Sequence, residues 1–191
     1  MEDRQLTYPI GLLSYYREAE LRGADLLQRL LRKADDGELQ IKLTRHLADE
    51  ARHAWQWTEL ICELGGEPAA LRTGSPQWLR RQVGLPSSIL DLLALTQVVE
   101  ERVRQRYREH AARPGEEPRI VAVLQTILGD EEWHLAWVED WLAKAQKKEG
   151  RTRVTAALDH YRALEVNAYA ELMREEEKLR AAEVSLAIVP W

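Results

Sequence analysis

The sequence predicts an all-α protein, a four-helix bundle followed by one further helix at the C-terminus. Apolar residues recur at three- and four-residue steps over long segments, which is the period of one helix face. The breaks between these segments are rich in Gly, Pro and Asp. With 191 residues, 45% of them apolar, and a net charge of −5, the chain can bury one sizeable core. We therefore expect a bundle over residues 1–150, with residues 151–191 forming a C-terminal helix and an apolar tail.

The first predicted helix carries one acid on its apolar face. That face is formed by Leu13, Tyr16, Glu20, Leu27 and Leu31. Glu18 falls on the opposite, wet side, so Glu20 is the inward acid. The break at residues 34–37 is short, and it predicts that the next helix returns antiparallel to the first.

The second predicted helix contains the string Asp49-Glu50-Ala51-Arg52-His53 within its apolar stripe. A Glu and a His three positions apart lie on one helix face, about one turn from each other. Both can therefore reach a single point beside the helix. Residues 65–88 then form a long connection, typical of a crossover that returns the chain to the starting end of a bundle, and Ser87 or Ser88 would cap the next helix.

The third and fourth predicted helices repeat this arrangement. Glu100 lies on the apolar face of the third helix, whereas Glu101 lies on the outer face. After a short break at residues 113–118, the fourth helix carries Asp130-Glu131-Glu132-Trp133-His134 within its stripe. The chain thus contains an internal repeat in which a helix with one inward Glu precedes a helix with Asp-Glu-x-x-His.

This pattern predicts a dinuclear metal site in the core. A single Glu-x-x-His is common by chance, and a lone core His is more often a packed residue than a ligand. Two copies that both carry the preceding Asp, each inside an apolar stripe, are much rarer. Buried carboxylates without partners are costly, so four glutamates in one core require cations. Carboxylate and imidazole donors together suit iron, manganese or zinc.

These residues resemble the ferritin-like diiron carboxylate proteins, a family that includes bacterioferritin, rubrerythrin and the bacterial multicomponent monooxygenases. The order of the lone and paired glutamates matches that family over residues 8–145. The resemblance implies two iron ions, with Fe/Mn and Mn/Mn pairs as alternatives. One ion would be bound by Glu20, Glu50 and His53 and the other by Glu100, Glu131 and His134, with Glu50 and Glu131 bridging.

The string around Arg52 also resembles the Asp-Glu-x-Arg-His signature of the diiron oxygenases, although Trp133 replaces Arg in the second copy. Asp49 and Asp130 match positions where a carboxylate accepts the N–H of a ligating imidazole. A solvated charge is the alternative for each. Tyr16 and Tyr107 lie a turn or two from Glu20 and Glu100, where they could relay electrons or serve only as core packing.

The rest of the chain narrows the remaining roles. The C-terminal helix is expected over residues 152–183, with His160 and Glu165 at its surface, and it would cover the bundle or pair with a second subunit in a homodimer. The apolar tail at 184–191 would dock on the bundle or on a partner. Cys62 is the single cysteine, which excludes an intramolecular disulfide and a cysteine-rich electron-transfer module, so electrons would come from an external donor.

No signal peptide or membrane span is expected, and a cytoplasmic location is the default expectation. The arginines at 102, 104, 106 and 108 are interpreted as a solvated, salt-bridged face. The alternative is an RNA-binding patch of the kind that a diiron tRNA hydroxylase would need.

Three activities share this predicted ligand set: iron storage, peroxide reduction, and activation of dioxygen against an organic substrate. The long C-terminal helix differs from the short terminal helix of ferritins. The sequence therefore favours a diiron oxidoreductase that reacts with dioxygen or peroxide, with iron storage or peroxide detoxification as the alternatives.

Overall fold

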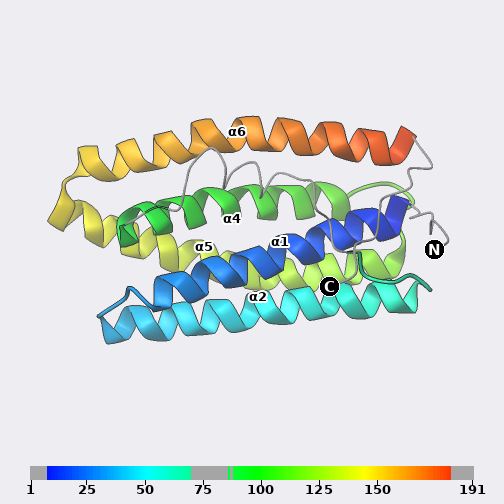
Figure 1. Cartoon of the computed structure of the whole chain (residues 1–191), viewed down its shortest axis with the longest axis horizontal. Coiled ribbons are helices and arrows are strands. Elements are labelled where there is room, and N and C mark those ends of the chain that lie inside the picture. The colour runs from blue at the N-terminus through cyan, green and yellow to red at the C-terminus, as the bar shows by residue number, and fades with distance from the viewer. Residues whose placement is uncertain (1–7, 70–85, 87, 182–191) are drawn as a thin grey trace.

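A computed structural model describes residues 8–69, 86 and 88–181. The described residues form five helices and no strand: α1 Tyr8–Leu31, α2 Gly37–Glu63, α4 Ile89–Ala111, α5 Pro118–Glu149 and α6 Arg151–Ala181 (Figure 1). The predicted all-α class is confirmed. None of the described helices contains a stretch apolar enough to cross a bilayer.

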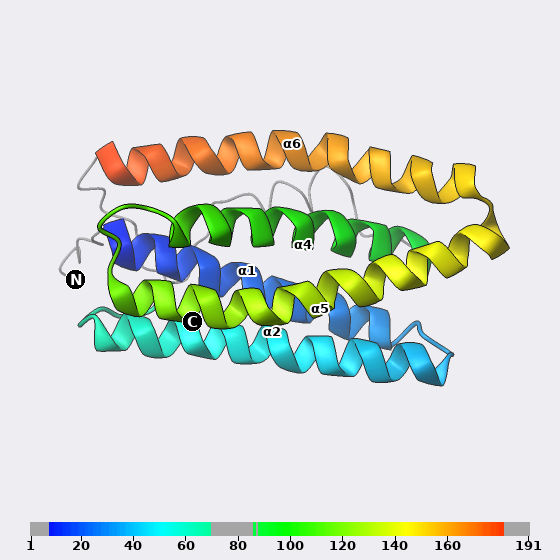
Figure 2. The ribbon, with the colours of Figure 1, turned by 180° about the vertical axis from the view of Figure 1, so that it is seen from behind.

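The first four helices form two antiparallel pairs, α1 with α2 and α4 with α5 (Figures 1 and 2). Helices α2 and α4 run in the same direction, so the end of α2 and the start of α4 lie at opposite ends of the bundle. This is the arrangement that a long crossover connection requires. Most of the predicted crossover, including Ser87, lies outside the described residues.

Local signals in the sequence set the helix ends. The Asp36 side chain accepts a hydrogen bond from the Glu38 N–H at 3.1 Å and caps α2. Ser88 caps α4 by accepting from the Asp91 N–H at 3.0 Å. Gly150 has φ +88°, a conformation that side chains disfavour, and it separates α5 from α6 by a single residue. The chain therefore reverses sharply at this corner.

Helix α6 lies along α4 and also contacts α5 (Figures 1 and 2). Its buried side chains include Val154, Tyr161 and Ala168. His160 is exposed as expected, but the expectation for Glu165 was wrong. Glu165 is buried because its two carboxylate oxygens accept hydrogen bonds from the Arg102 guanidinium at 2.7 and 2.9 Å. The apolar tail at 184–191 lies outside the described residues.

The described core has three apolar clusters, one between α4 and α6 around Val98 and Tyr161 and two at opposite ends of the bundle. Of the two end clusters, one contains Leu27, Leu43 and Val138, and the other contains Trp57 and Ile127. The acids and histidines of the predicted site come from positions between the two end clusters along the helices. This polar layer of the core therefore has apolar side chains on both sides.

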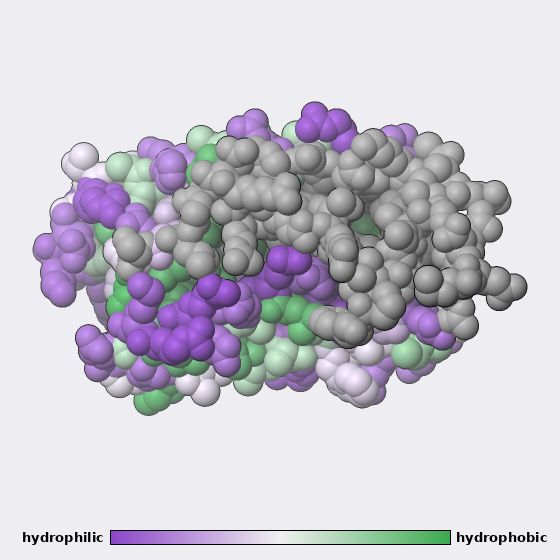
Figure 3. Space-filling view, in the orientation of Figure 1, coloured by the Kyte–Doolittle hydropathy of each residue, from purple (hydrophilic) through white to green (hydrophobic). Residues whose placement is uncertain are grey.

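On the face shown in Figure 3, hydrophilic side chains gather at the end where α5 turns into α6.

Candidate metal centre

The six residues predicted as ligands come together in the middle of the bundle. Each of the four bundle helices supplies a carboxylate, and α2 and α5 each add a histidine. Their relative exposures lie between 0 and 6%, and the set consists of Glu20, Glu50, His53, Glu100, Glu131 and His134. The helical phase inferred from the apolar stripes places all six side chains in the core, as the sequence predicted.

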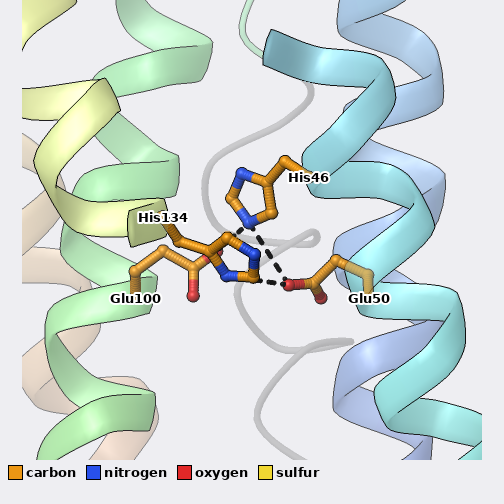
Figure 4. Close-up of side chains that lie close together, drawn as sticks. All are labelled: His46, Glu50, Glu100 and His134. Carbon is orange, nitrogen blue, oxygen red and sulfur yellow. Dashed lines mark ion pairs between the residues drawn. The ribbon is translucent and has the colours of Figure 1, made fainter. Parts of the chain in front are cut away.

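Two groups of donor atoms can be distinguished in this layer. In the first, one donor atom from each of Glu20, Glu50, His53 and Glu131 lies within 4.8 Å of the others. The second group is formed in the same way by His46, Glu50, Glu100 and His134, whose side chains converge between α2, α4 and α5 (Figure 4). Because Glu50 belongs to both groups, the two positions share a carboxylate.

Glu50 and Glu131 lie between the two histidines of the predicted motifs. Glu131 has one oxygen 3.7 Å from His53 Nδ1 and the other 3.4 Å from His134 Nδ1. Glu50 Oε1 lies 3.8 Å from His134 Nδ1, while the same carboxylate belongs to the group around His53. These two glutamates therefore occupy the positions that carboxylates bridging two ions would take.

The two aspartates contact the histidines, but each serves the motif on the opposite helix. His53 Nε2 lies 3.1 Å from Asp130 Oδ2, and His134 Nε2 lies 3.3 Å from Asp49 Oδ2. Arg52 joins the pair, with its guanidinium 2.6 Å from Asp49 and 2.9 Å from Asp130. A carboxylate acceptor places the proton on Nε2, so Nδ1 of each histidine is free to face the centre.

Crowding of the carboxylates perturbs their protonation. Burial, together with the charges of Glu100 and Glu20, raises the pKa of Glu50 to about 8. Burial and the neighbouring carboxylates also raise the pKa of Glu131 well above its ordinary value. Without a cation, these two groups therefore hold protons near neutral pH.

The histidines and Glu100 balance part of this charge. Burial opposes ionisation of Glu100, but the close His46 imidazole and the charge on His134 lower the pKa of Glu100 to about 2. Burial opposes charging of His53 as well, yet Glu20 and Glu50 raise its pKa to about 9. Burial and the charge on His46 lower the pKa of His134 to about 4. The centre is thus strongly coupled electrostatically.

Several inward-facing atoms have no hydrogen-bond partner although they are fully buried. They are His46 Nε2, Glu50 Oε1, His53 Nδ1, both oxygens of Glu131 and His134 Nδ1. Buried polar atoms without partners are rare in folded proteins, and here they gather in one layer. Carboxylate oxygens and imidazole nitrogens are the donors that iron and manganese accept. The donor set therefore fits a pair of such ions.

His46 was not among the residues predicted from the sequence. It is fully buried on α2, with Nε2 3.3 Å from Glu50 Oε1 and 3.1 Å from Glu100 Oε1. Although burial opposes its charge, these two carboxylates raise the pKa of His46 to about 9. The sequence signal for His46 was its spacing from Glu50, because a residue four positions before Glu50 lies on the same inward face of the helix.

Gly23 is a second residue that the sequence reasoning missed. A Cβ at this position of α1 would overlap Glu50 Oε2 and would lie 2.9 Å from Glu50 Cδ. Glycine therefore allows the Glu50 carboxylate to lie against the backbone of α1. A glycine inside a helix costs about 1 kcal/mol of stability relative to alanine. Its presence inside the first predicted helix therefore indicated a place where another group approaches the backbone closely.

The two tyrosines form an aromatic cluster with Trp57. The Tyr107 hydroxyl donates to Glu20 Oε1 at 2.5 Å, and burial raises the pKa of Tyr107 well above its ordinary value. The Tyr16 ring lies edge-on to that of Tyr107 at 4.9 Å, and its hydroxyl lies 3.0 Å from His110 Nδ1. Tyr107 thus contacts a predicted ligand directly, whereas the described hydrogen bonds of Tyr16 go to other residues.

The expected solvated arginine face is only partly present. Arg108 is exposed and lies 3.3 Å from Glu132, as expected of such a face. Arg106, in contrast, is buried, and its Nε donates to the Tyr16 hydroxyl at 3.3 Å. The interpretation of Arg106 as solvated was wrong because its guanidinium turns into the aromatic cluster.

The two acids assigned to the outer faces take part in ion pairs. Glu18 lies 2.6 Å from Arg22 on α1. Glu101 accepts from Arg162 of α6 at 3.2 Å, so it faces α6 and has no contact with the centre among the described interactions.

Comparison with known proteins identifies the family. No curated protein matches the chain. Among solved structures, the fold is similar to a dodecameric thioferritin, the bacterioferritin-related protein of Bacteroides fragilis, with a TM-score of 0.55 and 23% identity over 74% of this chain and 91% of that chain. The family model of the ferritin-like domain matches residues 26–148, which span α2, α4, α5 and the end of α1. The chain therefore belongs to the ferritin-like family.

Proposed function

We propose that this protein binds two iron ions in the centre and uses them as an oxidoreductase that reduces dioxygen or peroxide. The observation that carries the proposal is the layer of buried donor atoms without partners, supplied by all four bundle helices. We assign Glu20, Glu50 and His53 to one ion and Glu100, Glu131 and His134 to the other, with Glu50 and Glu131 bridging. Iron would supply electrons to the oxidant, and an external donor would restore them.

The residues around the centre prepare it for such a reaction. Asp130 and Asp49 orient the imidazole rings of His53 and His134. The Arg52 guanidinium forms ion pairs with both aspartates and so keeps them in place. Tyr107 donates to Glu20, which orients that carboxylate toward the centre. The apolar clusters on both sides exclude water from the layer. The Arg52 string, shared in pattern with diiron oxygenases, favours oxidation of a substrate over iron storage.

Iron storage is the second candidate. A structurally similar protein is described as a dodecameric thioferritin, and a storage shell requires contacts between many subunits. On the outside of α2, Ile41 and Trp55 are 73% and 58% exposed and would offer apolar contact area to another copy. A homodimer would use the same area without forming a shell. Storage and redox chemistry would then differ in how much iron each chain retains.

Anaerobic titration with ferrous iron, followed by mixing with dioxygen or hydrogen peroxide, tests the proposal. We expect about two ferrous ions per chain and oxidation that repeats when a chemical reductant is supplied. Retention of many ferric ions per chain in a large assembly, measured by metal analysis and light scattering, would support storage instead. A single tightly held ion would contradict the dinuclear centre.

Two neighbouring acids provide a matched pair of variants. Glu100→Gln should lose one of the two ions, because Glu100 belongs to the second donor group. Glu101→Gln should retain both ions, since Glu101 contacts Arg162 of α6 instead. Metal content measured on both purified variants checks this assignment. Equal loss of iron from the two would mean that the ligands are assigned to the wrong helix face.

A further inference from the structure

His46 stands within the donor layer, yet two features of its surroundings distinguish it from the other two histidines. Its Nε2 faces Glu50 and Glu100, while its Nδ1 faces away toward α5. There the indole N–H of Trp137 donates to Nδ1 at 3.3 Å. Both side chains are buried, at 0 and 3% exposure.

The Trp137 contact fixes the position of the proton on His46. An indole nitrogen can only donate, so in the neutral ring of an ion-loaded centre Nδ1 of His46 must accept and cannot carry a hydrogen. In a neutral imidazole the hydrogen then lies on Nε2, the atom that faces the centre. His53 and His134 have the opposite arrangement, because their outer nitrogens lie against carboxylates. Their inner nitrogens are free to bind an ion, and that of His46 is not.

The packing of His46 against His134 leads to the same conclusion. Their rings are stacked with centroids 3.6 Å apart and planes within 25° of parallel. A metal ion binds an imidazole nitrogen in the plane of the ring. An ion in the plane of His134 therefore lies well outside the plane of His46, so the two rings cannot both bind it well in this arrangement.

We infer that His46 is a hydrogen-bond donor to the carboxylates of the centre and not a seventh metal ligand, and that Trp137 holds it in the required tautomer. The inference rests on the proposed dinuclear site. His46 Nε2 lies 3.3 Å from one oxygen of Glu50 and 3.1 Å from one of Glu100, although neither contact is aligned as a hydrogen bond in this structure. Binding of the ions would align the N–H with these oxygens. A hydrogen at this place stabilises negative charge on both oxygens and leaves the other oxygen of each carboxylate to bind an ion. His46 is therefore a positioning residue for the second ion.

Nitrogen NMR of the zinc-loaded protein tests the tautomer without any activity measurement. Zinc is diamagnetic, and the chain has only five histidines, so long-range proton–nitrogen spectra of histidine-labelled protein can resolve each ring. We expect His53 and His134 to show zinc-bound Nδ1, and His46 to show a protonated Nε2 with an accepting Nδ1. A zinc-bound Nε2 on His46 would overturn the inference while leaving the metal centre intact. Failure of the wild-type chain to bind zinc would overturn both.

Two variants extend the test. Trp137→Phe keeps an aromatic ring but removes the indole N–H, so a population of His46 with hydrogen on Nδ1 should appear. An unchanged tautomer would show that Trp137 does not hold it. His46→Gln should still bind two zinc ions, with affinity for the second lowered about tenfold, whereas His134→Gln should lose one ion. Equal loss of zinc from both variants would identify His46 as a ligand and refute the inference.

Discussion

Removing the metal should make the stability of the folded protein strongly dependent on pH. The pKa of Glu50 is raised from 4.5 to about 8, so the folded chain holds a proton that the unfolded chain has released over that range. Stability is highest below about pH 4.5 for this group and falls as the pH rises toward 8. His46 and His53, with pKa values raised from 6.5 to about 9, stabilise the fold fully below pH 6.5 and lose that effect as the pH rises through 9.

Two other groups act in the opposite direction at lower pH. The pKa of His134 is lowered from 6.5 to about 4, so its contribution is present above pH 6.5 and is lost as the pH falls through 4. Glu100, lowered from 4.5 to about 2, contributes above pH 4.5 and loses its effect as the pH falls through 2. The metal-free protein should therefore be most stable at mildly acid pH and should weaken steadily above pH 6.5.

The size of the effect above pH 6.5 follows from the number of protons involved. A net excess of one proton on the folded chain lowers the free energy of unfolding by about 1.4 kcal/mol per pH unit. For a chain of this length, each kcal/mol shifts the melting temperature by about 2–4 °C. Because Glu50, His46 and His53 each hold an excess proton over much of this range, the chelated protein should lose at least about 3–6 °C per pH unit between pH 6.5 and 8.

Thermal melts of chelated and manganese-loaded protein, followed by circular dichroism across pH 6.5–8, measure this slope. Bound manganous ions occupy the carboxylates and compete with their protons, so the loaded form should show little or no decline. Equal slopes for the two forms would refute the reasoning. A melting temperature of the chelated form that rises over this range would refute it as well.

Two further variants test the surroundings of the centre. Gly23→Ala should add about 1 kcal/mol of helix stability to the chelated protein. The added methyl group should also displace Glu50, so zinc affinity measured by calorimetry should fall about tenfold or more. Unchanged affinity would contradict the close approach seen at Gly23. Arg52→Ala should weaken binding of both ions about 10- to 100-fold because it releases both aspartates from their shared cation. Exposed Arg119 provides the matched control, and Arg119→Ala should leave zinc affinity unchanged.

The helices and the burial of the six candidate ligands could be predicted from the sequence because both depend on spacing within single helices. A residue three or four positions from an apolar neighbour shares its face wherever the helix packs. Glu20 and Glu100 were therefore separable from Glu18 and Glu101 before any tertiary contact was known. The helical class and the family followed from the same regularity.

Features that depend on contacts between helices could not be found in this way. The pairing of Asp49 with His134, and of Asp130 with His53, requires the relative rotation of α2 and α5. Glu165 looked solvated because its own helix could not reveal the Arg102 guanidinium on α4. Arg106 turned inward for a similar reason, since its hydroxyl partner belongs to α1.

The internal repeat of the chain also suggests more symmetry than the centre has. Four residues before Glu131 stands Ile127, which is buried among the aromatic rings, whereas His46 occupies the corresponding place before Glu50. One half of the centre therefore has an apolar side chain where the other has an imidazole.

The two lone glutamates, Glu20 and Glu100, therefore lie against different donor groups. Glu20 accepts from the hydroxyl of Tyr107, which follows Glu100 by seven residues. The corresponding residue after Glu20 is Leu27, which has no hydrogen to donate, and Glu100 instead lies 3.1 Å from His46 Nε2. Burial raises the pKa of the Tyr107 phenol well above its ordinary value, whereas the pKa of His46 is about 9, so His46 loses a proton at a lower pH than Tyr107 does. The two halves of the centre are thus chemically unlike, although the chain repeats the same ligands in both.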